Sequence, residues 1–106
     1  MSTPTLEDKF NEAMLNIYKE ALRACNYRAK AYLAMVVELG GIKTAKKLLG
    51  SEEIQSGLYE LFRCGRLDLT VEHLVLKDEF RILFLPDEIE EAKRRLDQLK
   101  ETGEKT

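Results

Sequence analysis

The sequence predicts an all-α protein, a compact bundle of about five helices with a long helical segment at its N-terminal end. Apolar residues recur at spacings of three and four along most of the chain, which is the period of a helix with one buried face. Capping residues and glycines divide this pattern into separate helices. With 106 residues, 44% of them apolar and 34% charged, the chain has the size and balance of one domain, residues 1–106.

The first helix can begin in two ways. Thr3 before Pro4 is one typical start, and Thr5 with Asp8 as a reciprocal capping pair is the other. From there to residue 25, apolar and polar residues fall on opposite faces. This pattern predicts an amphipathic helix that packs on one side.

The helical spacing continues beyond Asn26, so residues 4–39 could form one helix or two. Residues 27–39 are apolar nearly all round, and we expect them at the centre of the core. Gly40 and Gly41 then end the segment, because glycine accepts backbone angles that other residues avoid.

The middle of the chain predicts two shorter helices. Residues 42–49 place apolar residues on one side of a predicted helix and lysines on the other, and Gly50 ends this helix. Residues 51–56 are a polar connection, after which a third helix with Leu58 on its apolar face ends near Gly65.

The last third contains one ambiguous segment. Residues 65–76, GRLDLTVEHLVL, suit a strand by their β-branched and leucine content, or a short helix capped by Thr70. We expect the helix. Asp78 can cap a further turn, Pro86 opens the final helix, and residues 100–106 form a polar tail that we expect to fray.

The chain has few residues suited to metal binding or redox chemistry. Cys25 and Cys64 lie far apart, and neither has a second Cys or His at metal-ligand spacing. We therefore expect no disulfide, no metal and no cofactor, with both cysteines as small buried apolar residues. His73 is the one histidine, and we expect it to be structural.

Charge and hydropathy limit the possible partners. No apolar stretch is long enough to span a membrane, and the first residues, MSTPTLEDKF, lack the basic and apolar segments of a secretory signal. We therefore expect a cytoplasmic protein with no membrane partner. Residues 19–66 hold nine basic and five acidic residues, whereas from residue 67 onward seven basic residues face eleven acidic ones. The mildly basic middle could suit an anionic partner.

Five basic residues are candidates for contacts to nucleic-acid phosphates. Lys43, Lys46 and Lys47 share one surface of the predicted helix over residues 42–49, and Arg63 and Arg66 at the end of the next helix could extend it. The alternative is an ordinary solvated face, and the overall acidity of the chain argues against strong non-specific binding.

A local cluster of ionisable residues does not support catalysis. Arg66, Asp68, Glu72 and His73 are neighbours in the sequence, but at helical spacing His73 points about a hundred degrees away from the two acids. Asp68 is better explained by a turn cap or a pair with Arg66. No phosphate-binding loop or nucleophile elbow is present either, so we expect no catalytic residues and no enzyme activity.

Residues 40–65, GGIKTAKKLLGSEEIQSGLYELFRCG, resemble the helix-turn-helix of bacterial DNA-binding proteins, in which an Ala-rich helix ends in LLG and a second helix begins near LY. The resemblance implies that the second helix enters the major groove while the first crosses the backbone. Two features depart from the motif. The turn between Gly50 and Leu58 is longer than usual, and the second helix offers few donors to bases beyond Tyr59, Glu60 and Arg63.

A broader resemblance covers about the last two thirds of the chain. The segments YLAMVVELGGIKTAKKLL, SGLYELFRCGRLDLTVEHLVL and LFLPDEIEEAKRRL are similar to a family of small uncharacterised bacterial proteins, and the middle block is the most distinctive. The resemblance implies a bacterial cytoplasmic origin and a single fold unit. It implies no site, because the family has no established activity.

These observations predict a non-enzymatic helical adaptor or regulatory protein that acts through protein contacts, as a homo-oligomer or as a subunit of a larger assembly. The amphipathic first helix could supply the partner surface. The tyrosines could do so too, since they combine a large apolar body with a polar tip; they are Tyr18, Tyr27, Tyr32 and Tyr59. Tyr27 and Tyr32 could instead fill the core. The alternative function is DNA binding through the helix-turn-helix-like residues 41–65.

Overall fold

The computed structural model of the chain describes residues 3–51 and 56–104. Within these ranges every regular element is a helix, which confirms the all-α prediction. In chain order the elements are α1 (Leu6–Cys25), α2 (Lys30–Leu39), α3 (Gly41–Leu49), α4 (Ser56–Arg63), the 3₁₀ turn η1 (Leu67–Leu69), α5 (Val71–Val75), the 3₁₀ turn η2 (Arg81–Leu83) and α6 (Pro86–Glu104).

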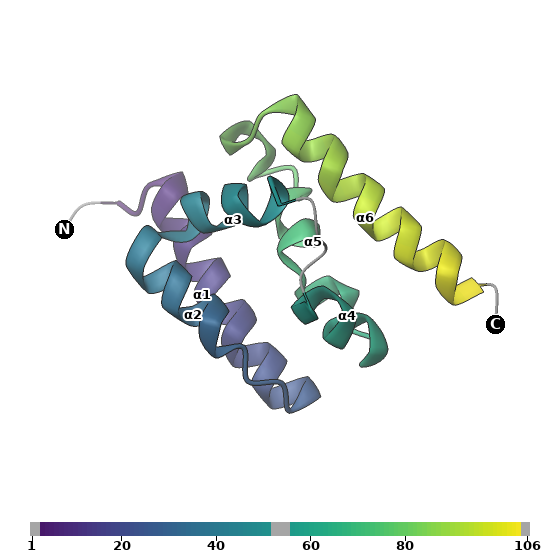
Figure 1. The fold of residues 1–106 in the computed structure, drawn as a ribbon. Coiled ribbons are helices and arrows are strands. Elements are labelled where there is room, and N and C mark those ends of the chain that lie inside the picture. Colours follow the sequence, from purple (N-terminus) through teal and green to yellow (C-terminus); the bar gives the residue numbers. More distant parts are fainter. Residues whose placement is uncertain (1–2, 52–55, 105–106) are drawn as a thin grey trace.

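The helices pack around two short central elements. In Figure 1, α1 and α2 form an antiparallel hairpin on one side of the molecule, and α6 lies along the other side. Between them, α3 and α5 each contact both α1 and α6. The four-residue connection between α1 and α2 places these two helices side by side.

The N-terminal segment is two helices. Thr5 Oγ1 accepts a hydrogen bond from Asp8 N at 3.0 Å, and Asp8 Oδ2 accepts one from Thr5 N at 3.2 Å, so the capping pair and not Thr3–Pro4 starts α1. Asn26 ends α1 in the left-handed conformation, with φ of 52°, which asparagine tolerates better than most residues. The chain then reverses into α2.

Gly40 and Gly41 both have structural reasons to be glycine. Gly40 has φ of 88° between α2 and α3, a value that side chains disfavour. A Cβ on Gly41 would lie 2.9 Å from Asn11 Cα, so α3 can begin this close to α1 only with glycine there. Asn11 Oδ1 also accepts a hydrogen bond from Gly41 N at 2.7 Å. The predicted break at these glycines is confirmed.

Phe10 of α1 stands at the centre of the main core. Its ring is fully buried and meets Phe80 and Phe84 edge-on, at centroid distances of 5.1 and 5.3 Å. The connection between α5 and α6 is therefore tied to α1 by three aromatic rings. The other buried members of this core are Met14, Val36, Ala45, Leu49, Val71, Leu74, Val75 and Ala92.

The prediction that residues 27–39 lie at the centre of the core is wrong. Val36 is the one buried residue of α2, and Val37 is 73% exposed. The segment is apolar nearly all round, but it packs against α1 and α3 along one side only, so much of its apolar surface faces outward.

The second half of the chain follows the predicted order of turns and helices. Thr70 caps α5, since its hydroxyl accepts a hydrogen bond from His73 N at 3.1 Å, so the helix prediction was correct here. A turn follows Asp78 as predicted, but η2 begins at Arg81 with Phe80 at its N-cap and no side-chain cap, so the predicted cap by Asp78 is wrong. The helix opened by Pro86 continues to Glu104, so residues 100–104 of the expected frayed tail are helical, and residues 105–106 lie outside the described residues. Most of the predicted connection at residues 51–56 lies outside the described residues.

A buried arginine joins the end of α3 to α5 and α6. The Arg95 side chain is 1% exposed. Its five N–H donors all have acceptors, and three of these are backbone carbonyls at or just after the end of α3. The acceptors are Glu91 Oε2 at 2.7 Å, Leu48 O at 3.0 Å, Glu72 Oε2 at 3.2 Å, Leu49 O at 3.2 Å and Ser51 O at 2.7 Å.

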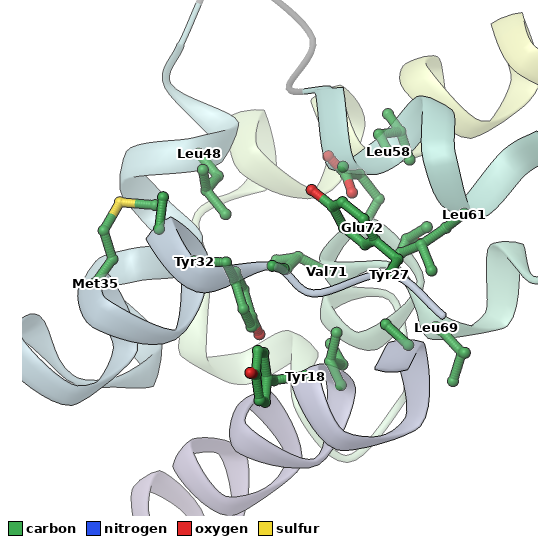
Figure 2. A pocket seen from close by; sticks show the side chains of 16 residues that line it. Tyr18, Tyr27, Tyr32, Met35, Leu48, Leu58, Leu61, Leu69, Val71 and Glu72 are labelled. Carbon is green, nitrogen blue, oxygen red and sulfur yellow. The ribbon is translucent and has the colours of Figure 1, made fainter. Parts of the chain in front are cut away.

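A cavity of about 140 Å³ lies between α1, α2, α4 and α5 (Figure 2). Tyr18, Tyr27 and Tyr32 point their rings toward it, and Glu72 of α5 contributes a carboxylate. Burial, with the Glu72 carboxylate nearby, raises the pKa of Tyr32 well above its usual range, so the hydroxyl stays protonated. This hydroxyl donates a hydrogen bond to Met14 O at 2.7 Å.

Candidate functional site

The candidate site is the outward side of α2, which is apolar and not covered by the described part of the chain. Successive residues on a helix are about 100° apart, so positions three and four apart share a side. The exposed residues of α2 follow this spacing. We name this surface the α2 face and define it by Lys30, Ala31, Ala34, Val37 and Glu38, all exposed.

The two charges of the α2 face stand at the wrong ends of their helix. Lys30 lies in the first turn of α2 and Glu38 in the last, whereas the helix dipole favours acids at the start and bases at the end. Neither side chain has an ion-pair partner among residues 3–51 and 56–104. Ala29, at the N-cap, makes no side-chain hydrogen bond to the helix. Within the described part of the chain, neither charge therefore makes a contact that stabilises α2.

The apolar side of α1, predicted as a possible partner surface, is covered by the protein itself. Phe10, Met14 and Ala21 are each at most 1% exposed. They pack into the two clusters between α1 and the elements α3, η1 and α5. Among the tyrosines, Tyr18, Tyr27 and Tyr32 line the cavity, and Tyr59 is 40% exposed on α4.

The three lysines predicted to contact phosphates lie on α3, but Lys46 has a structural role. Its Nζ lies 2.8 Å from Glu88 Oε1 and 5.3 Å from the centroid of the Phe84 ring. Burial raises the pKa of Glu88, but the hydrogen bonds from Lys46 and from Leu85 N, together with the charge of Lys46, outweigh burial and lower the pKa. Lys43 and Lys47 are exposed, with no ion-pair partner in the described part of the chain.

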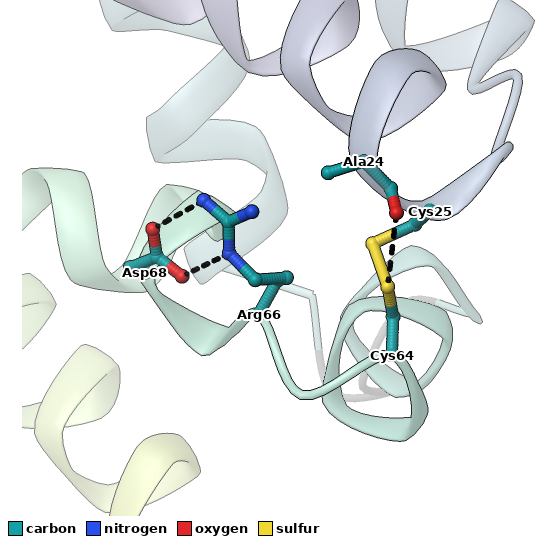
Figure 3. The surroundings of a disulfide bond; sticks show 5 residues. All are labelled: Ala24, Cys25, Cys64, Arg66 and Asp68. Atoms are coloured by element: carbon teal, nitrogen blue, oxygen red, sulfur yellow. Dashed lines mark hydrogen bonds and ion pairs between the residues drawn. A yellow bond between two sulfur atoms is a disulfide. The ribbon is translucent and has the colours of Figure 1, made fainter.

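The two arginines of the predicted phosphate surface are each paired with an acid. Arg63 Nη1 lies 3.0 Å from Glu60 Oε1 on α4. Arg66 makes a two-point contact with Asp68, at 2.9 and 3.0 Å, as expected from the sequence (Figure 3). Hydrogen bonding by Arg66 lowers the pKa of Asp68. These exposed pairs reduce the positive charge available to an anion.

The two helices of the proposed helix-turn-helix are α3, which ends at Leu49, and α4, which is described from Ser56; residues 52–55 of the connection lie outside the described residues. α3 packs on α1, α2 and α6, whereas α4 packs on η1. The structure thus places Lys43 and Lys47 on one helix and Arg63 and Arg66 around another that packs elsewhere.

The ionisable residues near the start of α5 do not converge on one point. Asp68 is exposed and pairs with Arg66, whereas Glu72 is buried and faces Arg95. His73 is exposed. Among residues 3–51 and 56–104, no three His, Cys, Asp or Glu side chains are grouped so that they could hold a metal ion.

The expectation about the cysteines is wrong. Cys25 at the end of α1 and Cys64 just after α4 form a disulfide, with Cα atoms 5.8 Å apart (Figure 3). Cys25 is half-buried and Cys64 is exposed, with its Sγ 3.7 Å from Ala24 O. The disulfide joins residues 39 positions apart and holds the end of α4 against α1.

Comparison with known proteins adds no assignment. The chain matches no protein-family model, no curated protein and no solved structure. The resemblances to a helix-turn-helix and to a small bacterial family therefore stay predictions. Across the described ranges, no helix combines the length and apolar character needed to cross a membrane.

The α2 face was not predicted from the sequence, although the charges of this helix are one signal for it. An apolar helix with a lysine in its first turn and a glutamate in its last has charges that oppose its own dipole. Such an arrangement indicates that the charges serve another surface. Arg95 had no comparable signal, because it stands in a charged run typical of a solvated helix, and nothing in the sequence pairs it with Glu72.

Proposed function

We propose that this protein is a helical interaction module that self-associates through the α2 face. One observation supports this most directly. α2 is an apolar helix whose outward side is exposed and carries Lys30 and Glu38 without partners in the described part of the chain. A second copy of the chain is the partner whose chemistry matches this surface best.

Antiparallel pairing of two α2 helices satisfies both charges. If the two-fold axis passes beside Ala34, Lys30 of one copy stands opposite Glu38 of the other, and the reverse. Ala31 then faces Val37 of the second copy. The small side chain of Ala34 lets the helices approach closely at their crossing, and the two helix dipoles oppose each other favourably.

The size of the α2 face sets the strength of the association. A helix of ten residues cannot cover the roughly 800 Å² per partner of a standard stable interface. We therefore expect a weak dimer whose population rises with protein concentration, as suits a regulatory contact.

A charge exchange tests the proposed register. In Lys30→Glu, the new glutamate faces Glu38 of the second copy, and in Glu38→Lys two lysines face each other, so each single variant should weaken the dimer. The double variant Lys30→Glu with Glu38→Lys restores both opposite-charge pairs and should restore dimerisation. Sedimentation velocity over a range of protein concentrations measures the dissociation constants.

A matched control is available on α3. Lys43→Glu reverses the charge of an exposed lysine outside the α2 face, and it should leave the dissociation constant unchanged. A monomer at all concentrations, or a double variant as weak as the single ones, would show that the α2 face is not the self-association surface.

DNA binding through residues 41–65 is the second candidate, favoured by the exposure of Lys43 and Lys47 on one helix. Because Lys46 holds Glu88, the variant that removes phosphate contacts without loosening α6 is Lys43→Ala with Lys47→Ala. Fluorescence anisotropy with duplex DNA at low and near-physiological salt separates the two candidates, since phosphate contacts lose affinity steeply as salt rises.

The cytoplasmic location expected from the sequence also remains a proposal, and the disulfide bears on it. Disulfides are rare in reducing compartments, so a cytoplasmic protein would hold Cys25 and Cys64 mainly as thiols. Alkylation of free thiols at the moment of cell lysis, followed by mass spectrometry, measures the reduced fraction.

A further inference from the structure

We propose that the cavity between α1, α2, α4 and α5 binds a compact organic cation, an ammonium group on a small apolar body, with Glu72 as the anionic contact. The cavity adjoins the α2 face, because Ala31 belongs to both, but its other walls lie inside the fold and the inference does not rest on self-association. The inference rests on three properties of the cavity: its size, its apolar walls and its one buried carboxylate.

The volume and the walls define the body of the ligand. A cavity near 150 Å³ with apolar walls accommodates a molecule about as large as benzene, and this cavity measures about 140 Å³. Aliphatic side chains form most of its surface (Figure 2). They come from the four surrounding helices and from the end of α3, and include Ile17, Met35, Leu48, Leu58, Leu61 and Val71.

Glu72 defines the charge of the ligand. Its side chain is 7% exposed, and its Oε2 accepts one hydrogen bond, from Arg95 Nη1 at 3.2 Å. A carboxylate can accept about four hydrogen bonds. Its Oε1 accepts no hydrogen bond from the described residues. A ligand in the cavity that carries N–H groups could therefore donate a hydrogen bond to this carboxylate.

Arg95 cannot donate a second hydrogen bond to the Glu72 carboxylate. Its other four N–H groups bind Glu91 and the carbonyls at the end of α3, so the guanidinium has no donor left for Glu72. An anionic ligand would be repelled by the Glu72 carboxylate. A neutral apolar ligand would fill the space but gain no attraction from the charge of Glu72.

The remaining polar groups of the wall are compatible with an ammonium group. The hydroxyls of Tyr32 and Thr70 are already bound to Met14 O and Leu67 O. Tyr18, Tyr27 and Tyr32 also line the cavity, and aromatic rings attract cations over their faces. Ala31 belongs to the cavity wall and is exposed, so the cavity reaches solvent beside the start of α2.

Three probes of nearly the same shape test the charge. Benzylammonium, benzyl alcohol and benzoate carry a cation, a neutral hydroxyl and an anion on the same ring. Titration of ¹⁵N-labelled protein, followed by amide chemical shifts, should give saturable shifts around the cavity with benzylammonium. We expect its dissociation constant to be at least about tenfold lower than that of benzyl alcohol, because it gains a charge-assisted hydrogen bond. Benzoate should not bind.

Two variants locate the site, and one serves as a control. Glu72→Gln removes the charge and should make benzylammonium bind no better than benzyl alcohol. Ala21→Leu places a larger apolar side chain at a wall position that is 1% exposed, so it should abolish binding of both probes even if Glu72→Gln does not fold. Glu79→Gln changes an exposed carboxylate and should alter nothing.

The proposal is wrong if benzyl alcohol binds as tightly as benzylammonium, or if benzoate binds. It is equally wrong if no probe gives saturable shifts at this cavity, or if Ala21→Leu still binds benzylammonium. A preference for the cation that survives in folded Glu72→Gln would exclude Glu72 as the anionic contact.

Discussion

Two buried threonines make opposite contributions to stability. Thr44 is fully buried, and its hydroxyl has no hydrogen-bond partner in the structure, whereas the Thr70 hydroxyl caps α5. A buried hydroxyl without a partner costs free energy, so Thr44→Val should raise the free energy of unfolding by about 1 kcal/mol. Urea denaturation measures the change.

The same substitution at Thr70 is the matched control. Thr70→Val removes the N-cap of α5 and should lower the free energy of unfolding by about 1 kcal/mol. Equal and destabilising effects at both positions would show that the Thr44 hydroxyl has a partner in solution.

Arg95 shows why single residues of the site were hard to predict. In the sequence it is the third member of Lys93-Arg94-Arg95, a run typical of a solvated helix surface. In the structure it is buried, because α3 ends against α6 and its last carbonyls need donors. Local sequence shows which groups a helix end leaves unpaired, but not which distant side chain reaches them.

At the scale of the helix, Glu91 of α6 makes the free energy of unfolding depend on pH. Both Glu91 oxygens accept hydrogen bonds from Arg94, and Oε2 also accepts one from Arg95. The hydrogen bonds from Arg94 lower the pKa of Glu91 to about 2, against the opposing effect of burial, and Arg95 lowers it further.

A lowered carboxyl pKa stabilises the fold above the pKa of the unfolded chain, and this contribution is lost as the pH falls toward the folded value. The loss from Glu91 should therefore occur between about pH 4.5 and pH 2, with a magnitude of about 2 kcal/mol. Urea denaturation across this range should show a shallower fall for Glu91→Gln than for the unchanged protein. Glu90→Gln, at an exposed neighbour, should keep the full slope.

The helices themselves were predictable where local chemistry determines them. Helix ends depend on contacts within a few residues, so the local sequence is enough to predict them. Examples are the reciprocal pair of Thr5 and Asp8, the cap at Thr70 and the break at Gly40. The position of α2 was not predictable in this way. An apolar helix has the same composition whether its own chain or a second copy covers it.

At the scale of the whole molecule, the cavity and the disulfide depend on residues brought together only by folding. The cavity wall runs from Ile17 to Glu72, and the disulfide joins Cys25 to Cys64. Periodicity cannot show that the ends of α1 and α4 meet, because each helix only reveals which of its sides is apolar. The α4 wall of the cavity is therefore set by tertiary packing together with one covalent bond.

Removal of that bond should destabilise the fold mainly through the unfolded chain. A crosslink between residues 39 positions apart restricts the unfolded ensemble, and the chain-entropy relation gives about 4 kcal/mol for a loop of this size. Cys25→Ser with Cys64→Ser should lower the free energy of unfolding by this amount. Because Cys64 is exposed, a phosphine reductant should have a similar effect on the unchanged protein and none on the double variant. An unchanged stability after complete reduction would mean that packing of Leu58 and Leu61 alone holds α4 in place and keeps the cavity closed on that side.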